Sequence, residues 1–318
     1  MNSKMTQEEA EKEFMLLVAG CGTQVDECDS QINQMYHYTT PEGLINILKQ
    51  NEIFLWFTKY DCLNDTSEGI EMMTHYQAAC NQLKKEQSMD DKTKLFYDYI
   101  LNIKPSNKQM IHFQLGPNLT GTKWLECDAY ICCFSEEHNS LDLWRYYSKN
   151  KHYEGYSIGF KYDIFENYCK IKNKKYKFEK IRVIYDNFKK EAYYKKIINK
   201  CYELYESGIL LRKIGYILVD VLSKTQLIFK HECFASEKEI RAILYVPKEN
   251  SDYDIKYRTK NGFIIPYIEE KFDKKHLSDV TIGPLINDEI AKNNLEQYLN
   301  SNGYKKIEVK NSKLPIRF

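Results

Sequence analysis

Six short polar clusters in this chain carry the side chains from which a ligand site could be built. Each cluster lies at the end of an expected strand or at a turn, far from the others in sequence. Such a set has no local reason to exist, whereas a ligand pocket needs polar groups that converge. The clusters are Tyr36-His37-Tyr38-Thr39, Leu63-Asn64-Asp65, Phe134-Ser135, Trp144-x-x-Tyr147, Gly155-Tyr156-Ser157 and Glu237-x-Glu239-x-Arg241.

Glu237, Glu239 and Arg241 occupy alternate positions in the last cluster, and Ile240 and Ala242 are the apolar residues that alternate with them. On a strand, Glu237 and Glu239 would lie on one face, and we expect Arg241 on the other. That carboxylate face could equally be plain solvent-exposed surface.

The other clusters also have structural interpretations. His37 precedes a predicted helix that begins at Pro41, so it could simply pack or cap. Trp144 and Tyr147 are three residues apart on a predicted helix, a spacing that is more typical of core packing than of a ligand platform. Asn64-Asp65 resembles an N-cap before a helix at Thr66–Tyr76.

The elements that position these clusters alternate irregularly between strand and helix. Apolar, β-branched and aromatic runs predict strands, and we expect five of them in one sheet system. These five are Gln34–Tyr38 (its core Met35–Tyr38), Glu52–Thr58, Ala129–Ser135, Tyr156–Phe160 and Glu239–Val246. Further strands are expected at Lys175–Tyr185, Phe263–Ile268, Val280–Ile282 and Lys306–Val309.

Helices are expected at residues 6–19, from Pro41, at Leu141–Ser148 and at Ile290–Leu299. Two longer stretches, 66–118 and 188–230, are interpreted as helical insertions, with Gly208 and Gly215 as possible breaks in the second. Strands scattered among helices favour an α+β fold over a doubly wound one. The predicted organisation is an N-terminal helix and linker over 1–33 and a single domain over 34–318.

Composition indicates a globular chain, with 43% hydrophobic residues, 14% aromatic residues and a formal net charge of +1. Residues 1–100 carry a net charge of −9 and residues 161–200 a net charge of +8. A solvated lysine-rich strand and loop explains the basic segment, and a phosphate-rich partner beside it is the alternative. Its lysines include Lys170, Lys172, Lys174, Lys175 and Lys177.

Cysteine usage and hydropathy indicate a cytoplasmic chain without a metal or a membrane span. The ten cysteines include no C-x-x-C pair, and no signal peptide is visible. Cys132-Cys133 and His231-Glu232-Cys233 are interpreted as structural, not zinc-binding. The most apolar region, Ile209–Leu222, is too short and too charged to cross a bilayer.

The ordered set of motifs resembles the bacterial family catalogued as domain of unknown function twenty-nine seventy-one. The resemblance runs from about Met35 to Arg317 and includes the closing elements Ile282-Gly283-Pro284 and Ser312-x-x-Pro315-x-Arg317. That family is grouped with the ADP-ribosyltransferase-like superfamily. The resemblance therefore implies a split mixed β-sheet of ADP-ribosyltransferase type with large helical insertions, and NAD as co-substrate.

The resemblance also implies roles for individual residues. Breaking the bond between nicotinamide and ribose builds positive charge on the ribose, which a nearby carboxylate stabilises. Glu239 is the first candidate for this catalytic carboxylate, and Glu237 the second. His37, Tyr38, Thr39, Tyr147 and Arg241 are candidates for binding NAD, with Tyr146 and Tyr156 competing for the role of Tyr147 as the stacking ring.

These implications predict that His37, Thr39, Tyr147 and Glu239 converge on one cleft. They also predict that Glu239→Gln abolishes turnover and leaves folding nearly intact. The implied function is transfer of ADP-ribose to a macromolecule, a protein or a nucleic acid, in a toxin or a phage-defence effector. The alternatives are an NAD glycohydrolase and a non-catalytic binding or scaffold protein of the same fold.

Overall fold

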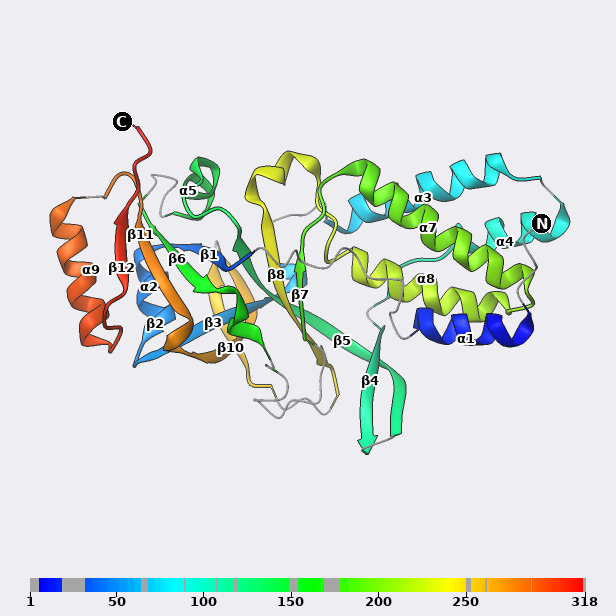
Figure 1. Ribbon diagram of the computed structural model, residues 1–318, viewed down its shortest axis with the longest axis horizontal. Helices are drawn as coiled ribbons and strands as arrows, with labels where there is room; N and C mark the ends of the chain where they lie inside the picture. The colour runs from blue at the N-terminus through cyan, green and yellow to red at the C-terminus, as the bar shows by residue number, and fades with distance from the viewer. Residues whose placement is uncertain are drawn as a thin grey trace.

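Strand β5 (Leu119–Ser135) is the element around which the sheet is organised (Figure 1). The computed structural model describes residues 6–18, 32–63, 68–88, 90–106, 108–116, 119–148, 154–166, 168, 178–249, 253–260, 262–286 and 288–316. For residues 108–116 and 119–125 it describes the backbone alone. The expected Asn64-Asp65 cap, the five lysines from Lys170 to Lys177, and Arg317 lie outside these residues.

The sheet is large, mixed and open, with helices on both of its faces. Its main path runs in the order β12-β11-β6-β1-β5-β3-β10-β9. The pair β11–β12 is parallel, and the other neighbours on this path are antiparallel. The strands are β1 (Gln34–Thr39), β3 (Glu52–Lys59), β6 (Tyr156–Lys161), β9 (Ile255–Lys260), β10 (Phe263–Asp273), β11 (Leu277–Ile282) and β12 (Glu308–Asn311).

Further strands branch from this path. Strand β8 (Glu239–Pro247) pairs with β5 from Cys127 to Ser135, and β7 (Phe178–Arg182) pairs with β8. Strand β4 (Lys108–Gly116) forms a projecting hairpin with the first half of β5 (Figure 1). The short β2 (Leu48–Lys49) pairs with β3.

The sheet divides along the edge of β5 that faces away from β8. Strand β1 pairs with β5 only at Tyr36–Ser135. Strand β3 pairs with β5 four residues earlier along β5, at Thr58–Ile131 and Lys59–Tyr130. Between these points the carbonyl of Cys133 accepts a hydrogen bond from Nδ1 of His37 at 2.8 Å. A side chain thus replaces backbone pairing where the two halves part.

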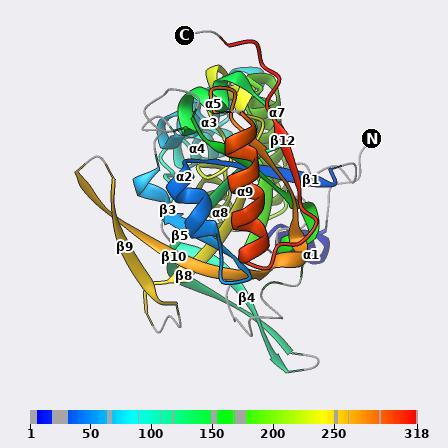
Figure 2. The same ribbon diagram turned by 90° about the vertical axis from the view of Figure 1, so that its left-hand side faces the viewer.

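The two faces of the sheet are covered by different elements. We call the face that carries Tyr38, Ser135 and Glu239 the α5 face, because Tyr38 packs there on Trp144 of helix α5 (Leu141–Tyr147). The opposite face, which carries Phe134 and Ile158, is the α9 face. Apolar residues of α2 (Pro41–Ile47) and α9 (Glu289–Ser301) pack on it, as Figure 2 shows for the helices.

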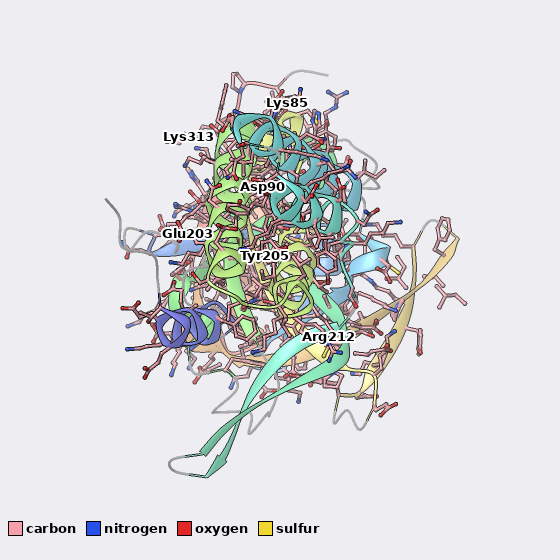
Figure 3. The ribbon with its side chains drawn as sticks, turned by 90° about the vertical axis from the view of Figure 1, so that its right-hand side faces the viewer. Lys85, Asp90, Glu203, Tyr205, Arg212 and Lys313 are labelled. Carbon is pink, nitrogen blue, oxygen red and sulfur yellow. The ribbon has the colours of Figure 1, made fainter. Side chains whose placement is uncertain are left out.

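A bundle of helices packs on the α5 face of β5 and β8, at one end of the molecule (Figures 1 and 3). Ile131, Ile243 and Tyr245 supply the sheet side of this core. Ala10 and Phe14 of the N-terminal helix belong to the same core. The helices are α1 (Gln7–Val18), α3 (Glu68–Glu86), α4 (Asp91–Ile100), α7 (Asn187–Glu206) and α8 (Leu211–Thr225).

The structure confirms the α+β class and the five strands expected in one sheet. The helical assignment of 66–118 is wrong beyond Ile100, because residues 108–116 form β4. Ile111, Phe113 and Leu115 alternate there with polar or small residues, the period of a strand. The expected strand Lys175–Tyr185 is described only as β7, and β9 was not expected at all.

The two glycines of the second helical stretch differ in role. Gly208 follows α7 with φ at +96°, a conformation that glycine adopts without strain, and so it ends the helix as expected. Gly215 is no break, since it lies inside α8. An added Cβ there would lie 2.5 Å from the hydroxyl of Tyr99, so this glycine allows close packing.

Candidate active site

Glu237 and Glu239 flank a sharp turn at the start of β8. Glu237 is the last residue of a 3-10 helix, η3 (Glu232–Glu237), and Lys238 follows with φ at +42°. The Ser135 hydroxyl donates to the Glu237 carbonyl at 2.6 Å, and the Glu136 N–H donates to the Lys238 carbonyl at 3.1 Å. The turn is therefore held by the end of β5.

The expectation that Arg241 lies on the other face from Glu239 is wrong. Residues two apart on a strand share a face, and the two side chains form a bidentate ion pair. The Nε of Arg241 donates to Oε1 of Glu239 at 2.9 Å, and Nη2 donates to Oε2 at 3.1 Å. A third donor, Nη1, reaches the carbonyl of Leu227 at 2.8 Å.

Lys230 joins both carboxylates into one buried cluster. Its Nζ donates to Oε2 of Glu237 at 2.6 Å and to Oε2 of Glu239 at 3.1 Å. Residues Lys230, Glu237 and Glu239 are each 5% exposed, and Arg241 is 1% exposed. When both acids are ionised, two negative charges meet two positive ones, so the cluster is neutral overall.

The two carboxylates have opposite pKa shifts. Burial alone would raise the pKa of Glu239, but Arg241 and Lys230 lower it to about 2. For Glu237, burial prevails over the attraction of Lys230, and its pKa is raised above the ordinary 4.5, with a further contribution from Glu239. Glu239 is thus a fixed negative charge, and Glu237 is the group that can exchange a proton.

Tyr147 is the candidate aromatic residue that the structure brings to this cluster. It ends α5 and is half-buried, with its hydroxyl 3.4 Å from Oε1 of Glu237. Burial and the two carboxylates raise its pKa well above 10, so it stays a hydrogen-bond donor. Trp144 is in the core against Tyr38, as its spacing suggested, and Tyr146 is exposed.

His37 and Thr39 do not converge with Glu239, contrary to the sequence prediction. The strand register places Tyr36, Ser135 and Glu239 in one row on the α5 face. His37 is paired with Ile158 on the opposite face, and its ring contacts Phe134 edge-on at 5.7 Å. Because side chains alternate along a strand, His37 and Thr39, on either side of Tyr38, lie on the α9 face.

His37 is held neutral in its position at the division of the sheet. Burial lowers its pKa, and the charge of Arg258 lowers it further, against the effect of the Cys133 carbonyl. Since that carbonyl can only accept, Nδ1 carries the proton. Tyr38 lies on the α5 face, but its hydroxyl is used structurally, between the Glu137 carbonyl and the Ser140 N–H.

Sequence reasoning missed Lys230 and Tyr185, because neither lies in a recognisable motif. The Tyr185 hydroxyl accepts from the Glu239 N–H at 3.1 Å. Lys190 of α7, fully buried, donates to the Lys230 carbonyl and to Glu71 of α3, each at 2.8 Å. The helical insertions therefore position the cation between the two acids.

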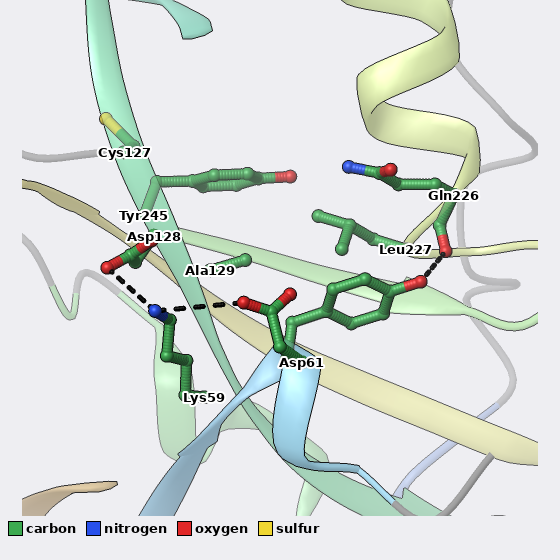
Figure 4. A pocket seen from close by; sticks show the side chains of 9 residues that line it. Lys59, Asp61, Cys127, Asp128, Ala129, Gln226, Leu227 and Tyr245 are labelled. Carbon is green, nitrogen blue, oxygen red and sulfur yellow. Dashed lines mark hydrogen bonds and ion pairs between the residues drawn. The ribbon is translucent and has the colours of Figure 1, made fainter. Parts of the chain in front are cut away.

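A small pocket lies next to this cluster, where the end of α8 meets β3, β5 and β8 (Figure 4). Leu227, whose carbonyl accepts a hydrogen bond from Arg241, is one of its lining residues. Lys59 lies between Asp61 and Asp128, at 3.7 and 3.3 Å. The charged groups of the pocket are thus paired with each other. None of the expected site residues lines the pocket.

The described residues contain neither a cluster of metal ligands nor a helix suited to a membrane. Among them, no group of three or more His, Cys, Asp or Glu side chains could hold a metal ion. None of the described helices is long and apolar enough to cross a membrane.

Comparison with known proteins gives one family match, which covers part of the chain. Residues 143–242 match the family model described as "Protein of unknown function (DUF2971)". This segment includes Tyr147, Lys230 and the Glu237–Arg241 region, whereas His37 and Thr39 lie outside it. No curated protein and no solved structure matched the chain.

Proposed function

We propose that the chain is an NAD-consuming ADP-ribosyltransferase-like enzyme whose chemistry is centred on Glu237. The main observation in support is that Glu237 and Glu239, two adjacent buried carboxylates with opposite pKa shifts, lie beside Tyr147 on one face of the sheet. Two carboxylates that differ in this way suit a division between fixed charge and proton transfer. The matched family segment supports placing the chemistry here.

In this proposal the two acids have different tasks. Glu239 stays ionised and opposes the positive charge that develops on the ribose. Glu237 accepts the proton of the acceptor as its oxygen or nitrogen bonds to the ribose carbon, and nicotinamide leaves with the electron pair of the broken bond. Tyr147 donates toward Glu237 and stabilises its ionised form. Lys230 keeps Glu237 close to Glu239.

The proposal differs from the sequence expectation in two residues. Glu239 has both oxygens bonded to Arg241 and one also to Lys230, so Glu237 is the better candidate for contact with substrate. His37 lies on the opposite face of the sheet and is therefore not part of this site. The split of the sheet beside β5 supports the ADP-ribosyltransferase type of fold.

A second candidate function is a non-catalytic scaffold that keeps this fold. The observation that favours it is the charge balance of the cluster, since buried networks with every charge paired also serve structure alone. An NAD glycohydrolase, with water as the acceptor, is the intermediate alternative.

Incubation with NAD labelled on its adenine separates these functions. The purified protein is mixed with candidate proteins, DNA and RNA, and covalent label and free nicotinamide are both measured. Label that survives denaturation on a macromolecule supports the transferase. Nicotinamide release without label indicates the glycohydrolase. Neither product, from a folded protein with every acceptor, contradicts catalysis and favours the scaffold.

A further inference from the structure

Two buried oxygen atoms of strand β11 have no hydrogen-bond partner in the described part of the chain. They are Oδ1 of Asp279 and Oγ1 of Thr281, residues that are 3% and 2% exposed. A third, Oγ of Ser157, lies near the Tyr38 hydroxyl without a hydrogen bond of normal geometry. Buried polar atoms are almost always bonded, and leaving one unpaired costs free energy. The stability of the free protein therefore does not explain this group.

The strand register places these atoms together on the α5 face. Thr281 of β11 is paired with Ser157 of β6, and Ser157 is paired with Tyr38 of β1. Asp279 is two residues from Thr281 on the same strand, so the two side chains share a face. Strands β1, β6 and β11 lie below α5 in Figure 1. Two of the polar clusters noted in the sequence thus meet two residues that the sequence did not single out.

The Asp279 carboxylate has one committed oxygen and one free oxygen. Its Oδ2 binds Nζ of Lys310 at 3.3 Å. On the neighbouring strand it faces Gly159, where an added Cβ would lie 3.0 Å from Oδ1, so the glycine leaves the room that the carboxylate occupies. Tyr36 lies beyond Gly159 in the same row, and burial and the charge of Asp279 both raise its pKa. The carboxylate therefore lies between a cation and an aromatic ring.

The way to this carboxylate runs past Lys310 and Tyr36. The Lys310 side chain is 38% exposed, and its contacts with Asp279 and Glu308 are long, at 3.3 and 3.4 Å. Charge-assisted bonds are usually shorter, about 2.7–2.9 Å, so this side chain is loosely held. Tyr36 is half-buried. A ligand that moves Lys310 aside reaches Oδ1 from solvent.

The chemistry of the group suits neighbouring hydroxyls better than a charged ligand. A phosphate would meet the Asp279 carboxylate, and a cation would compete with Lys310 for it. A ligand hydroxyl donates to Oδ1 of Asp279, and a second hydroxyl beside it accepts from Thr281. The ring of Tyr36 adds an apolar surface next to them. Adjacent hydroxyls on a compact ring are the mark of a sugar.

We propose that Asp279 and Thr281 bind two neighbouring hydroxyl groups of a sugar on the α5 face. The sugar is a free monosaccharide or the ribose of a nucleoside, which share this pair of hydroxyls. The site goes beyond the proposed function, because four strand steps, roughly 19 Å, separate β11 from Glu239 on β8. The row that joins them is Glu239, Ser135, Tyr36, Gly159 and Asp279.

Ligand-observed NMR titration with D-glucose, D-ribose, adenosine and dideoxyadenosine tests the site directly. Binding of glucose or ribose indicates a free sugar. Adenosine that binds about 10-fold or more tightly than dideoxyadenosine, which lacks both ribose hydroxyls, indicates a nucleoside. Asp279→Asn should weaken the probe that binds by about 10-fold or more. Glu308→Gln is the matched control, since Glu308 binds the same lysine but is 70% exposed, and should leave binding within about 2-fold.

A second variant combines a binding test with a stability test. Thr281→Val replaces an unpartnered buried hydroxyl by a methyl group of the same shape, so the free protein should melt about 1–2 °C higher while the probe binds more weakly. Thr225→Val is its control, because the buried Thr225 hydroxyl bonds that of Tyr194 at 2.6 Å. This control should melt at a lower temperature and bind the probe as the wild type does.

Four results overturn the sugar site. They are a wild type that binds none of the four probes, equal binding of adenosine and dideoxyadenosine without monosaccharide binding, undiminished binding by Asp279→Asn, and a Thr281→Val variant less stable than the wild type. If Asp279→Asn does not fold, Thr281→Val decides alone. Probe binding that Glu237→Gln weakens and Asp279→Asn does not would place the sugar at the Glu237 cluster instead. None of these measurements requires NAD cleavage, so the failure of either proposal leaves the other standing.

Discussion

Replacing Glu239 with glutamine should destabilise the fold far more than replacing Glu237. Glu239 is 5% exposed and is the partner of Arg241 through two hydrogen bonds and of Lys230 through a third. Glutamine removes the charge and leaves a buried cation uncompensated. Breaking a buried ion pair in this way typically costs about 3–5 kcal/mol.

The same substitution at Glu237 is milder, because Lys230 keeps Glu239 as a partner. The raised pKa of Glu237 also means that its charged form is already disfavoured, and glutamine resembles the protonated acid. We expect a loss of about 1–2 kcal/mol. Glu137→Gln is the control, since Glu137 forms an exposed pair with Lys238 that is worth about 0–1 kcal/mol.

Urea unfolding at pH 7, followed by circular dichroism, measures these differences. With a slope of about 3 kcal/mol/M, the Glu239→Gln midpoint should fall by about 1–1.7 M. The carboxylate stabilises the fold fully above its unfolded pKa of 4.5, and this contribution is lost as pH falls toward its folded pKa of about 2. The deficit of the variant should therefore shrink over that range.

The reasoning is refuted if Glu239→Gln unfolds within about 1 kcal/mol of Glu137→Gln at pH 7. That result would mean that the cluster is hydrated or rearranges freely. The sequence alone suggested that Glu239→Gln would leave folding nearly intact. Because Glu239 is buried and has two cationic partners, the structure predicts instead that Glu239→Gln destabilises the fold.

Three further outcomes follow from the geometry. Tyr147→Phe should move the acid limb of any NAD-cleaving activity to higher pH by less than about one unit, because a donor at 3.4 Å stabilises ionised Glu237 only weakly. A kcat–pH profile measures this shift, and a shift to lower pH would be inconsistent with the prediction. Activity of the wild type should itself rise through a pKa above 4.5, the direction in which Glu237 is shifted, and a limb below 4.5 would point to Glu239. Gly215→Ala should lower stability by about 1–3 kcal/mol in a thermal melt, since its Cβ would lie 2.5 Å from the Tyr99 hydroxyl; a stabilised variant would show that Tyr99 moves aside.

The strands were predictable where the sequence signal is local. Runs such as Glu52–Thr58 and Glu239–Val246 are apolar on both faces, and the structure buries both faces of β8 between two cores. Residues 108–116 were assigned to a helical stretch, although their alternation of apolar and polar residues is that of a strand. Strand β9 is an exposed edge strand rich in charge, so it lacks an apolar run.

The site was only partly predictable, because convergence depends on register. The sequence singles out Glu237, Glu239 and Tyr147 as polar residues at the ends of elements. In the structure Tyr147 contacts Glu237, and Lys230 joins Glu237 to Glu239. His37 satisfies the same criterion but lies on the other face, since a shift of one residue along a strand reverses the side chain. Lys230 has no motif, and only the packing of α7 and α8 reveals it.

Nicotinamide release from NAD by the wild type, Glu237→Gln and Glu137→Gln tests the central claim most directly. Each protein is assayed at pH 7.5, at a concentration where its melt shows it folded, with NAD binding measured in parallel. The account predicts that the wild type and Glu137→Gln release nicotinamide at similar rates. Glu237→Gln should be slower by about 10²–10³, with NAD affinity changed little, because its carboxylate acts mainly in the transition state. Turnover by Glu237→Gln near the wild-type rate, or a folded wild type that releases no nicotinamide with any acceptor, would contradict it.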